Sequence, residues 1–261
     1  MRRLHLFEFE DLPLLPRALR DATTLYLETV ERVFGVHRLF APKLAEALSS
    51  TGERRLLDMG SGGGGPIRHV VAEVERTLGA PVHVTLSDLR PNERAARVLE
   101  AQGDGRLRYL REPVDASNPP PALPGVRSMF AFFHHLPPAA ARETLARAYR
   151  GREAICIFEI TDPTPAGLLG CLLMPLYVLL FTPLVRPLTV SQLLLTYLLP
   201  VLPLLIAWDG LVSTLRTYDP EQLRRMTRDL QDEGYRWEIG RMRHPTLPIT
   251  FPYAVGAPCP G

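Results

Sequence analysis

The strongest structural signal in this sequence is a glycine-rich loop, Asp58-Met59-Gly60-Ser61-Gly62-Gly63-Gly64-Gly65-Pro66. It follows a short apolar run at residues 55–59, which is typical of a buried strand, and it precedes an amphipathic helix pattern that Gly79 ends. A loop in this position brings backbone N–H groups and a helix N-terminus to the carboxyl edge of a sheet. Side chains would block a ligand from that backbone and would disfavour positive φ, so the glycines predict a binding loop.

The segments around this loop alternate between short apolar runs and amphipathic helices, which is typical of a parallel sheet with helical crossovers. Further strands are predicted at residues 82–86, 107–110, 128–133 and 154–160, with helices at residues 91–101 and 139–149. The first fifty residues carry apolar side chains at helical spacing, which predicts a two-helix N-terminal cap.

The end of the chain predicts one more helix and two strands. Asp219 is expected to cap the helix, with Pro220 at its first position, Gln222 reaching back, and Gly234 at its end. Residues 235–242 and 249–255 then read as an antiparallel strand pair at one edge of the sheet.

The glycine loop fits two binding patterns. Gly60, Gly62 and Gly65 satisfy the dinucleotide pattern G-x-G-x-x-G, whereas Asp58, Gly60, Gly62 and Gly64 satisfy the acidic-x-G-x-G-x-G pattern of methyltransferases. The first pattern leaves a nicotinamide-dependent oxidoreductase as an alternative function.

Aspartates at the ends of predicted strands, together with the terminal strand pair, favour the second pattern. A carboxylate at Asp58 suits the ammonium group of a methionine moiety and would repel a pyrophosphate. Asp88 is placed to accept the hydroxyls of a ribose, a feature that suits either cofactor. Asp115, in Val114-Asp115-Ala116, is placed to accept an adenine amino group. The alternative is that Asp88 and Asp115 only cap neighbouring turns or helices.

On these residues the sequence resembles the class I S-adenosylmethionine-dependent methyltransferase superfamily, over about residues 50–160 and the final strand pair. The resemblance implies an α/β fold with a Rossmann-like, seven-stranded, mostly parallel sheet whose last strand is antiparallel. It also implies that S-adenosylmethionine is the cofactor, with its methionine part near Gly60, Ser61, Gly62 and Gly64, its ribose near Asp88, and its adenine near Leu89, Asp115 and Ala116. Residues 7–13 and 209–218 are similar to stretches in uncharacterised bacterial members.

The reaction centre is expected where the fourth strand delivers Phe132-Phe133-His134-His135-Leu136. An aromatic face such as that of Phe133 attracts a sulfonium cation. His134 or His135 is a candidate base for the acceptor, and alignment alone is the alternative, with His134 touching the cofactor and His135 capping the next helix. Adjacent residues of an extended segment point to opposite sides, so no metal site is expected here. Glu159 and Asp162 are candidate polar groups on the acceptor side.

An apolar insertion at residues 166–208 contains Arg186 as its single charged residue. Three interpretations stay open: a two-helix lid over an apolar acceptor pocket, peripheral contact with a membrane, or a membrane-spanning hairpin. The prolines of this segment oppose the membrane-spanning hairpin, and the lid is the preferred interpretation. Arg20 and Arg216 are candidates for contact with a carboxylate of cofactor or substrate. The aromatic side chains expected to line the pocket are Tyr177, Phe181, Tyr197 and Trp208.

The bulk composition limits the partners and the compartment. Thirty basic against 28 acidic side chains give a net charge of +2, which predicts no nucleic-acid partner. Three cysteines are too few for a disulfide framework, and no targeting peptide is recognised, so a cytoplasmic location is expected, with membrane association as its alternative. The expected partner is a small apolar acceptor; a non-catalytic membrane-associated protein is a further alternative, and the oligomeric state stays unknown.

We expect a single methyltransferase domain over residues 1–261. Its expected parts are an N-terminal cap (1–50), a cofactor-binding core (51–162), an apolar lid (163–212), and a last helix with the strand pair (213–261).

Overall fold

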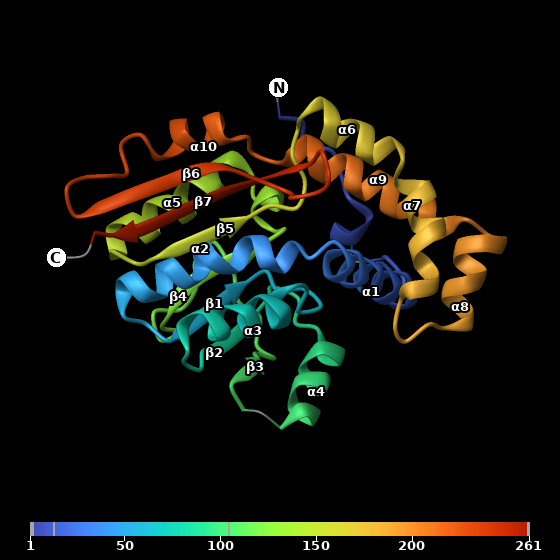
Figure 1. Ribbon diagram of the computed structural model, residues 1–261, viewed down its shortest axis with the longest axis horizontal. Coiled ribbons are helices and arrows are strands. Elements are labelled where there is room, and N and C mark those ends of the chain that lie inside the picture. The colour runs from blue at the N-terminus through green and yellow to red at the C-terminus, as the bar shows by residue number, and fades with distance from the viewer. Residues whose placement is uncertain (1–2, 13, 104, 260–261) are drawn as a thin grey trace.

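The protein is described by a computed structural model over residues 3–12, 14–103 and 105–259. A seven-stranded sheet in the order β3-β2-β1-β4-β5-β7-β6 lies at its centre (Figure 1). Strands β1 to β5 are parallel, and β7 runs antiparallel to both β5 and β6, as expected. The strands are β1 (Arg55–Met59), β2 (His83–Ser87), β3 (Leu107–Tyr109), β4 (Val126–Phe130), β5 (Ile155–Phe158), β6 (Tyr235–Arg243) and β7 (Thr250–Pro258).

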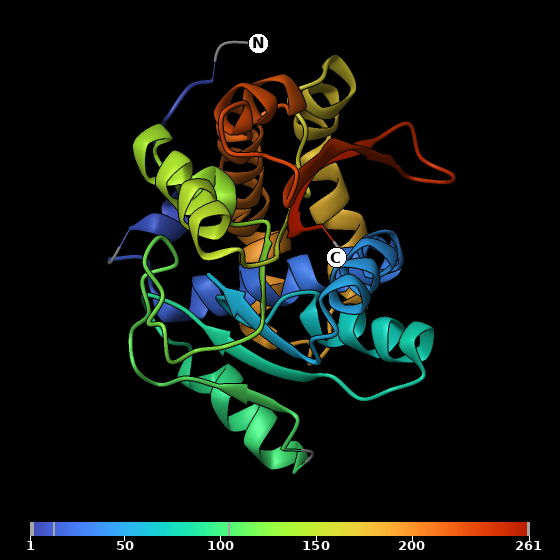
Figure 2. The same cartoon turned by 90° about the vertical axis from the view of Figure 1, so that its left-hand side faces the viewer.

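Helices cover both faces of the sheet (Figure 2). Strand β5 shows how the period of two divides its side chains, because Cys156 and Phe158 pack on one face while Ile155 and Ile157 pack on the other. The first face is covered by α2 (Val36–Thr51), α3 (Ile67–Leu78) and α4 (Glu93–Gln102), and the second by α5 (Pro138–Gly151) and α10 (Pro220–Thr227). All four residues of β5 are buried, as a parallel strand covered on both sides requires.

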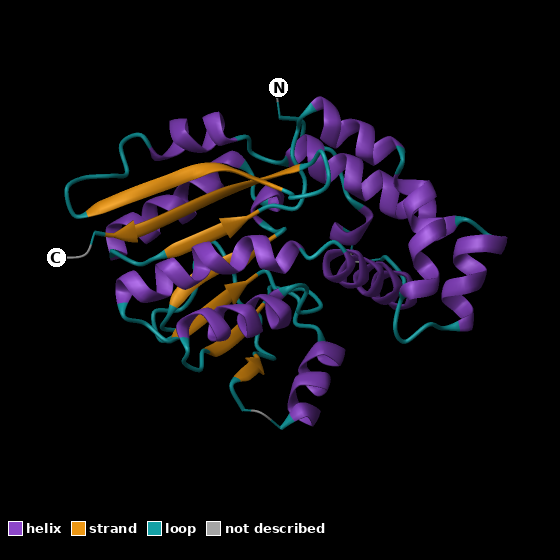
Figure 3. Ribbon diagram, viewed as in Figure 1, coloured by secondary structure: helices purple, strands orange, loops and turns teal. Residues whose placement is uncertain are grey.

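The insertion is helical and forms a third cluster at one end of the molecule (Figure 3). Val178 and Leu202 pack there against Ala22 and Tyr26 of α1 (Arg17–Val33). Its elements are α6 (Pro165–Leu172), α7 (Met174–Phe181), the 3₁₀ helix η3 (Thr182–Leu184), α8 (Val190–Leu193), the π-helix η4 (Leu194–Leu198) and α9 (Val201–Arg216).

No one helix in the described part of the chain has both the length and the apolar composition that crossing a membrane requires. Two bent helix pairs meet both conditions together, Pro165–Leu172 with Met174–Leu184 and Val190–Leu198 with Val201–Arg216, with bends of 56° and 79°.

Two predicted boundaries are wrong. Strand β4 ends at Phe130 and not at Phe133, because Ala131 takes a positive φ of 50° and directs the chain into the 3₁₀ helix η2 (Phe133–His135). Helix α10 ends at Thr227, before Gly234, whose N–H donates instead to Asp232 in a turn. The predicted cap of this helix is confirmed, since Asp219 and Gln222 form a reciprocal capping box.

Candidate functional site

The glycine loop lies at the carboxyl edge of the parallel strands and adopts conformations that side chains disfavour. Gly60, Gly62 and Gly64 have φ values of 70°, 50° and 90°. A Cβ on Gly60 would lie 2.2 Å from the ring of Phe132, whereas the space around Gly62 is open. The Tyr109 hydroxyl donates to the Gly62 carbonyl at 2.8 Å, so the loop is fixed while its backbone at Gly62 stays accessible.

Asp58, at the end of β1, holds the loop to the neighbouring strand. Its carboxylate is buried and accepts hydrogen bonds from the hydroxyls of Ser61 at 2.6 Å and Ser128 at 2.7 Å. Burial raises the pKa of Asp58 to about 6, against the opposing effect of the two hydroxyl donors. The two hydroxyl donors thus favour the charged form of this buried carboxylate, and burial disfavours it.

Asp88 and Asp115 lie beside the loop, and both make local turn contacts. Asp88 accepts from the N–H of Gly62 at 2.9 Å and from the N–H of Arg90 at 2.8 Å. Asp115 accepts from the N–H and the hydroxyl of Ser117. The N–H of Val114 donates to the Asp88 carbonyl at 2.9 Å, which holds the segments after β2 and β3 together.

The other two residues expected near the adenine differ in exposure. Leu89 is exposed next to Asp88, and Ala116 is buried in the core beneath α5.

The two phenylalanines after β4 lie in different places. Phe133 is buried in the hydrophobic cluster beneath α5, with its ring 5.5 Å from that of Tyr218. Its neighbour Phe132, which the sequence analysis did not select, packs against Gly60. The sequence showed two adjacent phenylalanines but not which of them faces the loop. The change from strand to 3₁₀ helix after β4 decides this.

His134 and His135 lie side by side, with ring centroids 4.3 Å apart. The expectation that they point to opposite sides is wrong, because they belong to a 3₁₀ turn and not to an extended strand. Glu159 binds His134 twice, through the backbone N–H at 2.8 Å and through Nδ1 at 2.7 Å. Nδ1 of His135 is 3.0 Å from Asp11.

Glu8 is a third member of this cluster and was missed by sequence reasoning. Its oxygens lie 3.8 Å from Nε2 of His134 and 3.7 Å from Nε2 of His135. Burial raises the pKa of Glu8 to about 7, although His135 and Arg216 act to lower it. The available signal was its place in residues 7–13, one of the two stretches for which the sequence analysis noted a resemblance.

Those two stretches pack on each other, which explains why Glu8 reaches the histidines. The segment of residues 3–12, here called the N-terminal strap, contacts α9 and η2. Asp209 accepts from the N–H groups of Phe9 and Glu10, and Arg216 donates to the Leu6 carbonyl and pairs with Glu8 and Asp11. The 3₁₀ helix η1 (Phe9–Asp11) is held in this way.

The remaining polar candidates bind groups of this chain. Arg20 donates to the carbonyls of Glu10 and Leu12. Asp162 pairs with Arg241 at 2.7 Å and accepts from Thr250.

Comparisons with solved structures identify the fold. An O-methyltransferase family protein from Burkholderia thailandensis superposes on 93% of this chain and 60% of its own, with a TM-score of 0.52 and 16% sequence identity. This chain has the class I methyltransferase fold.

A second structure with the methyltransferase fold agrees. It is an O-methyltransferase from neocarzinostatin biosynthesis in complex with S-adenosyl-L-homocysteine and 1,4-dihydroxy-2-naphthoic acid, with a TM-score of 0.50 and 16% identity over 95% of this chain and 59% of that one. The present chain therefore spans about three fifths of the length of both structures. Searches for a matching family model and for a matching curated protein found none.

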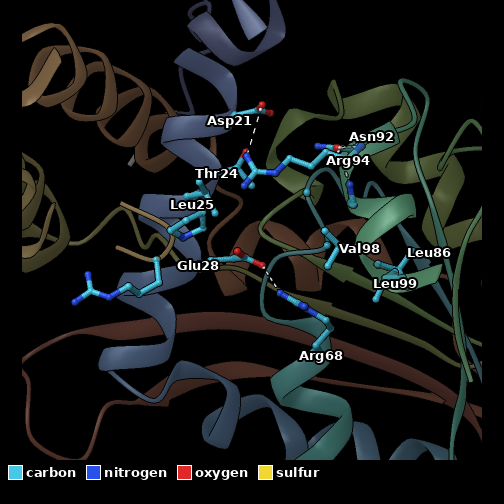
Figure 4. A pocket seen from close by; sticks show the side chains of 15 residues that line it. Asp21, Thr24, Leu25, Glu28, Arg68, Leu86, Asn92, Arg94, Val98 and Leu99 are labelled. Atoms are coloured by element: carbon cyan, nitrogen blue, oxygen red, sulfur yellow. Dashed lines mark hydrogen bonds and ion pairs between the residues drawn. The ribbon is translucent and has the colours of Figure 1, made fainter. Parts of the chain in front are cut away.

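A cavity of about 180 Å³ opens beside the glycine loop of this methyltransferase fold, between α1, α3 and α4 (Figure 4). Gly63 and Gly64 line it, but the three aspartates and the histidine cluster do not. Arg68 of α3 points across it to Glu28 of α1, with 3.1 Å between the charged atoms. Arg186, the single charged residue of the insertion, also lines the cavity.

The four aromatic side chains of the insertion do not gather around this cavity. Trp208 packs on Phe7 and donates to its carbonyl, and Tyr197 is exposed and donates to the Leu179 carbonyl. Tyr177 and Phe181 lie near each other, with ring centroids 6.5 Å apart. The expected aromatic lining is thus divided among separate neighbours.

Proposed function

We propose that this chain is a methyltransferase that uses S-adenosylmethionine to methylate a small apolar acceptor. The observation that carries the proposal is the exposed loop at Gly62, which has positive φ and open space where a Cβ would lie. Asp88 and Tyr109 hold its N–H and carbonyl groups at the carboxyl edge of this fold. A Cβ at Gly60 would displace Phe132, so the glycines are required by the space around the loop as well as by its dihedral angles.

The residues around the loop provide groups for each part of the cofactor. The N–H groups of Gly60 and Gly63 are the donors of this loop for a carboxylate, since those of Ser61, Gly62 and Gly64 donate within the chain. The charge of Asp58 favours an ammonium group nearby. Asp88 and Asp115 accept hydrogen bonds from ribose hydroxyls and from the adenine amino group, in addition to their local contacts. Leu89 adds exposed apolar surface for the purine, whereas Ala116 is buried.

S-adenosylmethionine supplies a methyl group on a cationic sulfur, which makes attack by an aligned nucleophile sufficient for transfer. Phe132 places an aromatic ring against Gly60, and His135 stacks on that ring with 5.7 Å between centroids. We assign activation of the acceptor to the histidine cluster next to this ring, and Glu159 to the positioning of His134.

The surface of the insertion supports an apolar acceptor delivered from a lipid bilayer. Sixteen of the 24 large hydrophobic side chains that the described residues expose lie between Leu169 and Leu204. They are leucines and valines with one tyrosine, Tyr197, whereas protein interfaces are enriched in Trp, Tyr and Arg. A surface of this kind is suited to acyl chains, so we propose peripheral membrane contact through residues 166–208.

Isothermal titration calorimetry of the full chain with S-adenosylmethionine and S-adenosylhomocysteine tests the cofactor. Binding of either compound at micromolar to millimolar concentration is expected, and reduced nicotinamide cofactors should give no fluorescence change on titration. A chain that binds the nicotinamide and neither sulfur compound would contradict the proposal.

Flotation with vesicles of phosphatidylcholine and phosphatidylglycerol tests the membrane contact. The wild-type chain is expected to float, and the double variant Leu172→Glu/Leu180→Glu, which changes two exposed side chains, is expected to stay in the protein fraction. Concentration-dependent dimers in light scattering, together with no flotation, would assign the surface to a second copy of the chain and reject the bilayer.

A further inference from the structure

We propose that Glu8, His134 and His135 form a binding site for one divalent transition-metal ion of the Zn²⁺ type. Two imidazoles and one carboxylate are a ligand set that such ions use in proteins. The candidate ligand atoms all lie within 4.8 Å of one another, and each Glu8 oxygen faces one imidazole Nε2, at 3.8 and 3.7 Å. Neighbouring ligands of a tetrahedral zinc ion are about 3.4 Å apart, so small side-chain rotations close the site.

The hydrogen bonds on the far side of each ring fix which nitrogen carries the proton. An ionised carboxylate only accepts hydrogen bonds, so Glu159 makes Nδ1 the donor in His134. Nδ1 of His135 lies 3.0 Å from Asp11 and 3.4 Å from Nη1 of Arg216, and the shorter contact, with Asp11, favours the same tautomer. Neutral rings then present the Nε2 lone pairs to Glu8. Carboxylates that hold the outer nitrogen of a histidine in this way are the usual support of metal-binding imidazoles.

The inner side of the cluster consists of acceptors that face one another. Nε2 of His134 and Oε1 of Glu8 are buried and have no hydrogen-bond donor among the described residues. Oε1 lies 3.1 Å from Nη1 of Arg216, an ion pair that does not supply a hydrogen bond of normal geometry. Buried acceptors without donors are costly, and a shared cation removes the cost for all three side chains.

The charge at the two imidazole rings favours a cation. With neutral imidazoles, three carboxylates face the rings, those of Glu8, Asp11 and Glu159, and Arg216 is the guanidinium that pairs with two of them, so these side chains carry a net charge of −2. The other charged groups that contact the strap are Glu10, Asp209, Arg3, Arg20 and Arg90, which brings the net charge of the wider region to −1.

The metal site stands independently of methyl transfer, since it is built on the strap and η2. Three protein ligands leave a coordination position for water or for an oxygen of the acceptor. His135 stacks on Phe132, which contacts the glycine loop, so this position lies on the side of the fold where activation of an acceptor is needed.

Calorimetric titration of the metal-free full chain with ZnCl₂ tests the proposal without any cofactor. We expect one site per chain, and weak or no binding of MgCl₂, because Mg²⁺ prefers oxygen ligands. Glu8→Gln, His134→Gln and His135→Gln should each weaken Zn²⁺ binding at least about 100-fold, and Asp11→Asn about 10- to 100-fold. His83→Gln, at an exposed histidine of β2, is the matched control and should bind as the wild type does.

Thermal unfolding guards against a variant that only fails to fold. Zn²⁺ is expected to raise the unfolding midpoint of the wild type and of His83→Gln, and to leave that of His135→Gln unchanged; this side chain is 23% exposed and tolerates replacement best. A folded wild-type chain that takes up no Zn²⁺ at 100 µM would overturn the site, as would equal binding by the Glu8 and histidine variants. Zn²⁺ binding in a chain that binds no S-adenosylmethionine would reject the proposed function and keep the metal site.

Discussion

The sheet core and the apolar insertion place their apolar side chains in opposite ways. In β5 every side chain is buried, because helices cover both faces of the strand. In the insertion α6 and α7 pack on α9, and α7 and α9 also contact α1, while Leu172, Val190 and Leu198 are at least 70% exposed. Amphipathic elements have a polar face for water, whereas helices that are apolar all round need a second apolar partner. The core thus buries its apolar side chains within the chain, whereas the insertion leaves many of its own exposed.

The largest difference is expected when one leucine of the sheet core and one leucine of the insertion are each replaced by alanine and the stability of the two variants is compared. Leu57→Ala, in the middle of β1, should lower the free energy of unfolding by about 2 to 5 kcal/mol, because it leaves a cavity in a fully packed core. Leu172→Ala, at a side chain that is 73% exposed, should change it by less than about 0.5 kcal/mol. Urea unfolding measures both. If the two variants lost equal stability, the outer face of α6 would be covered in solution and the comparison would fail.

Replacing one glycine by alanine is expected to have opposite consequences in the glycine loop and in the insertion. Gly60→Ala should weaken S-adenosylmethionine binding about 10- to 100-fold, since the new Cβ meets Phe132 at 2.2 Å and the residue has positive φ. Gly170→Ala lies in α6 with open space around it, and should raise the free energy of unfolding by about 0.5 to 1 kcal/mol through helix propensity. Calorimetry and urea unfolding of both variants measure these effects. Unchanged affinity in Gly60→Ala would show that the loop does not hold the cofactor.

A smaller difference is expected in pH dependence, between cofactor binding at the glycine loop and vesicle binding by the insertion. The pKa of Asp58 is raised to about 6, so ionising this carboxyl costs stability as pH rises from about 4 through 6. The ammonium of the cofactor favours the ionised form, and affinity should therefore fall by up to tenfold per pH unit below pH 6. Vesicle binding should not change between pH 5 and 7.5, because residues 166–208 contain no acidic side chain and no histidine. Parallel titrations and flotations check this, and Asp58→Asn should remove the slope in cofactor affinity.

The periodic parts of the fold were predictable because local sequence alone fixes them. The strand at residues 55–59, the parallel direction of β1 to β5 and the capping box of α10 all follow from spacing and capping rules. These rules did not predict in which direction each side chain after β4 points. Ala131 takes a positive φ that no propensity predicts, and it decides that Phe132 meets the loop while Phe133 enters the core.

The histidine cluster was also predicted only in part, because it depends on contacts between residues far apart in the sequence. His134 and His135 were recognised as chemically important, and Glu159 as a polar neighbour, because they follow adjacent parallel strands. Glu8 was not, because its position depends on the N-terminal strap being held by Asp209 and Arg216 of α9. Contacts between segments so far apart in sequence carry no periodic signal.

By itself the sequence determined the alternation of strands and helices, the glycine loop, and an insertion too apolar to face water on every side, because these depend on residue type and local spacing. Only the tertiary structure decided which carboxylate meets the two histidines, which ring touches the loop, and which leucines remain exposed. Those outcomes depend on how separate segments pack against one another, and packing is a property of the whole chain.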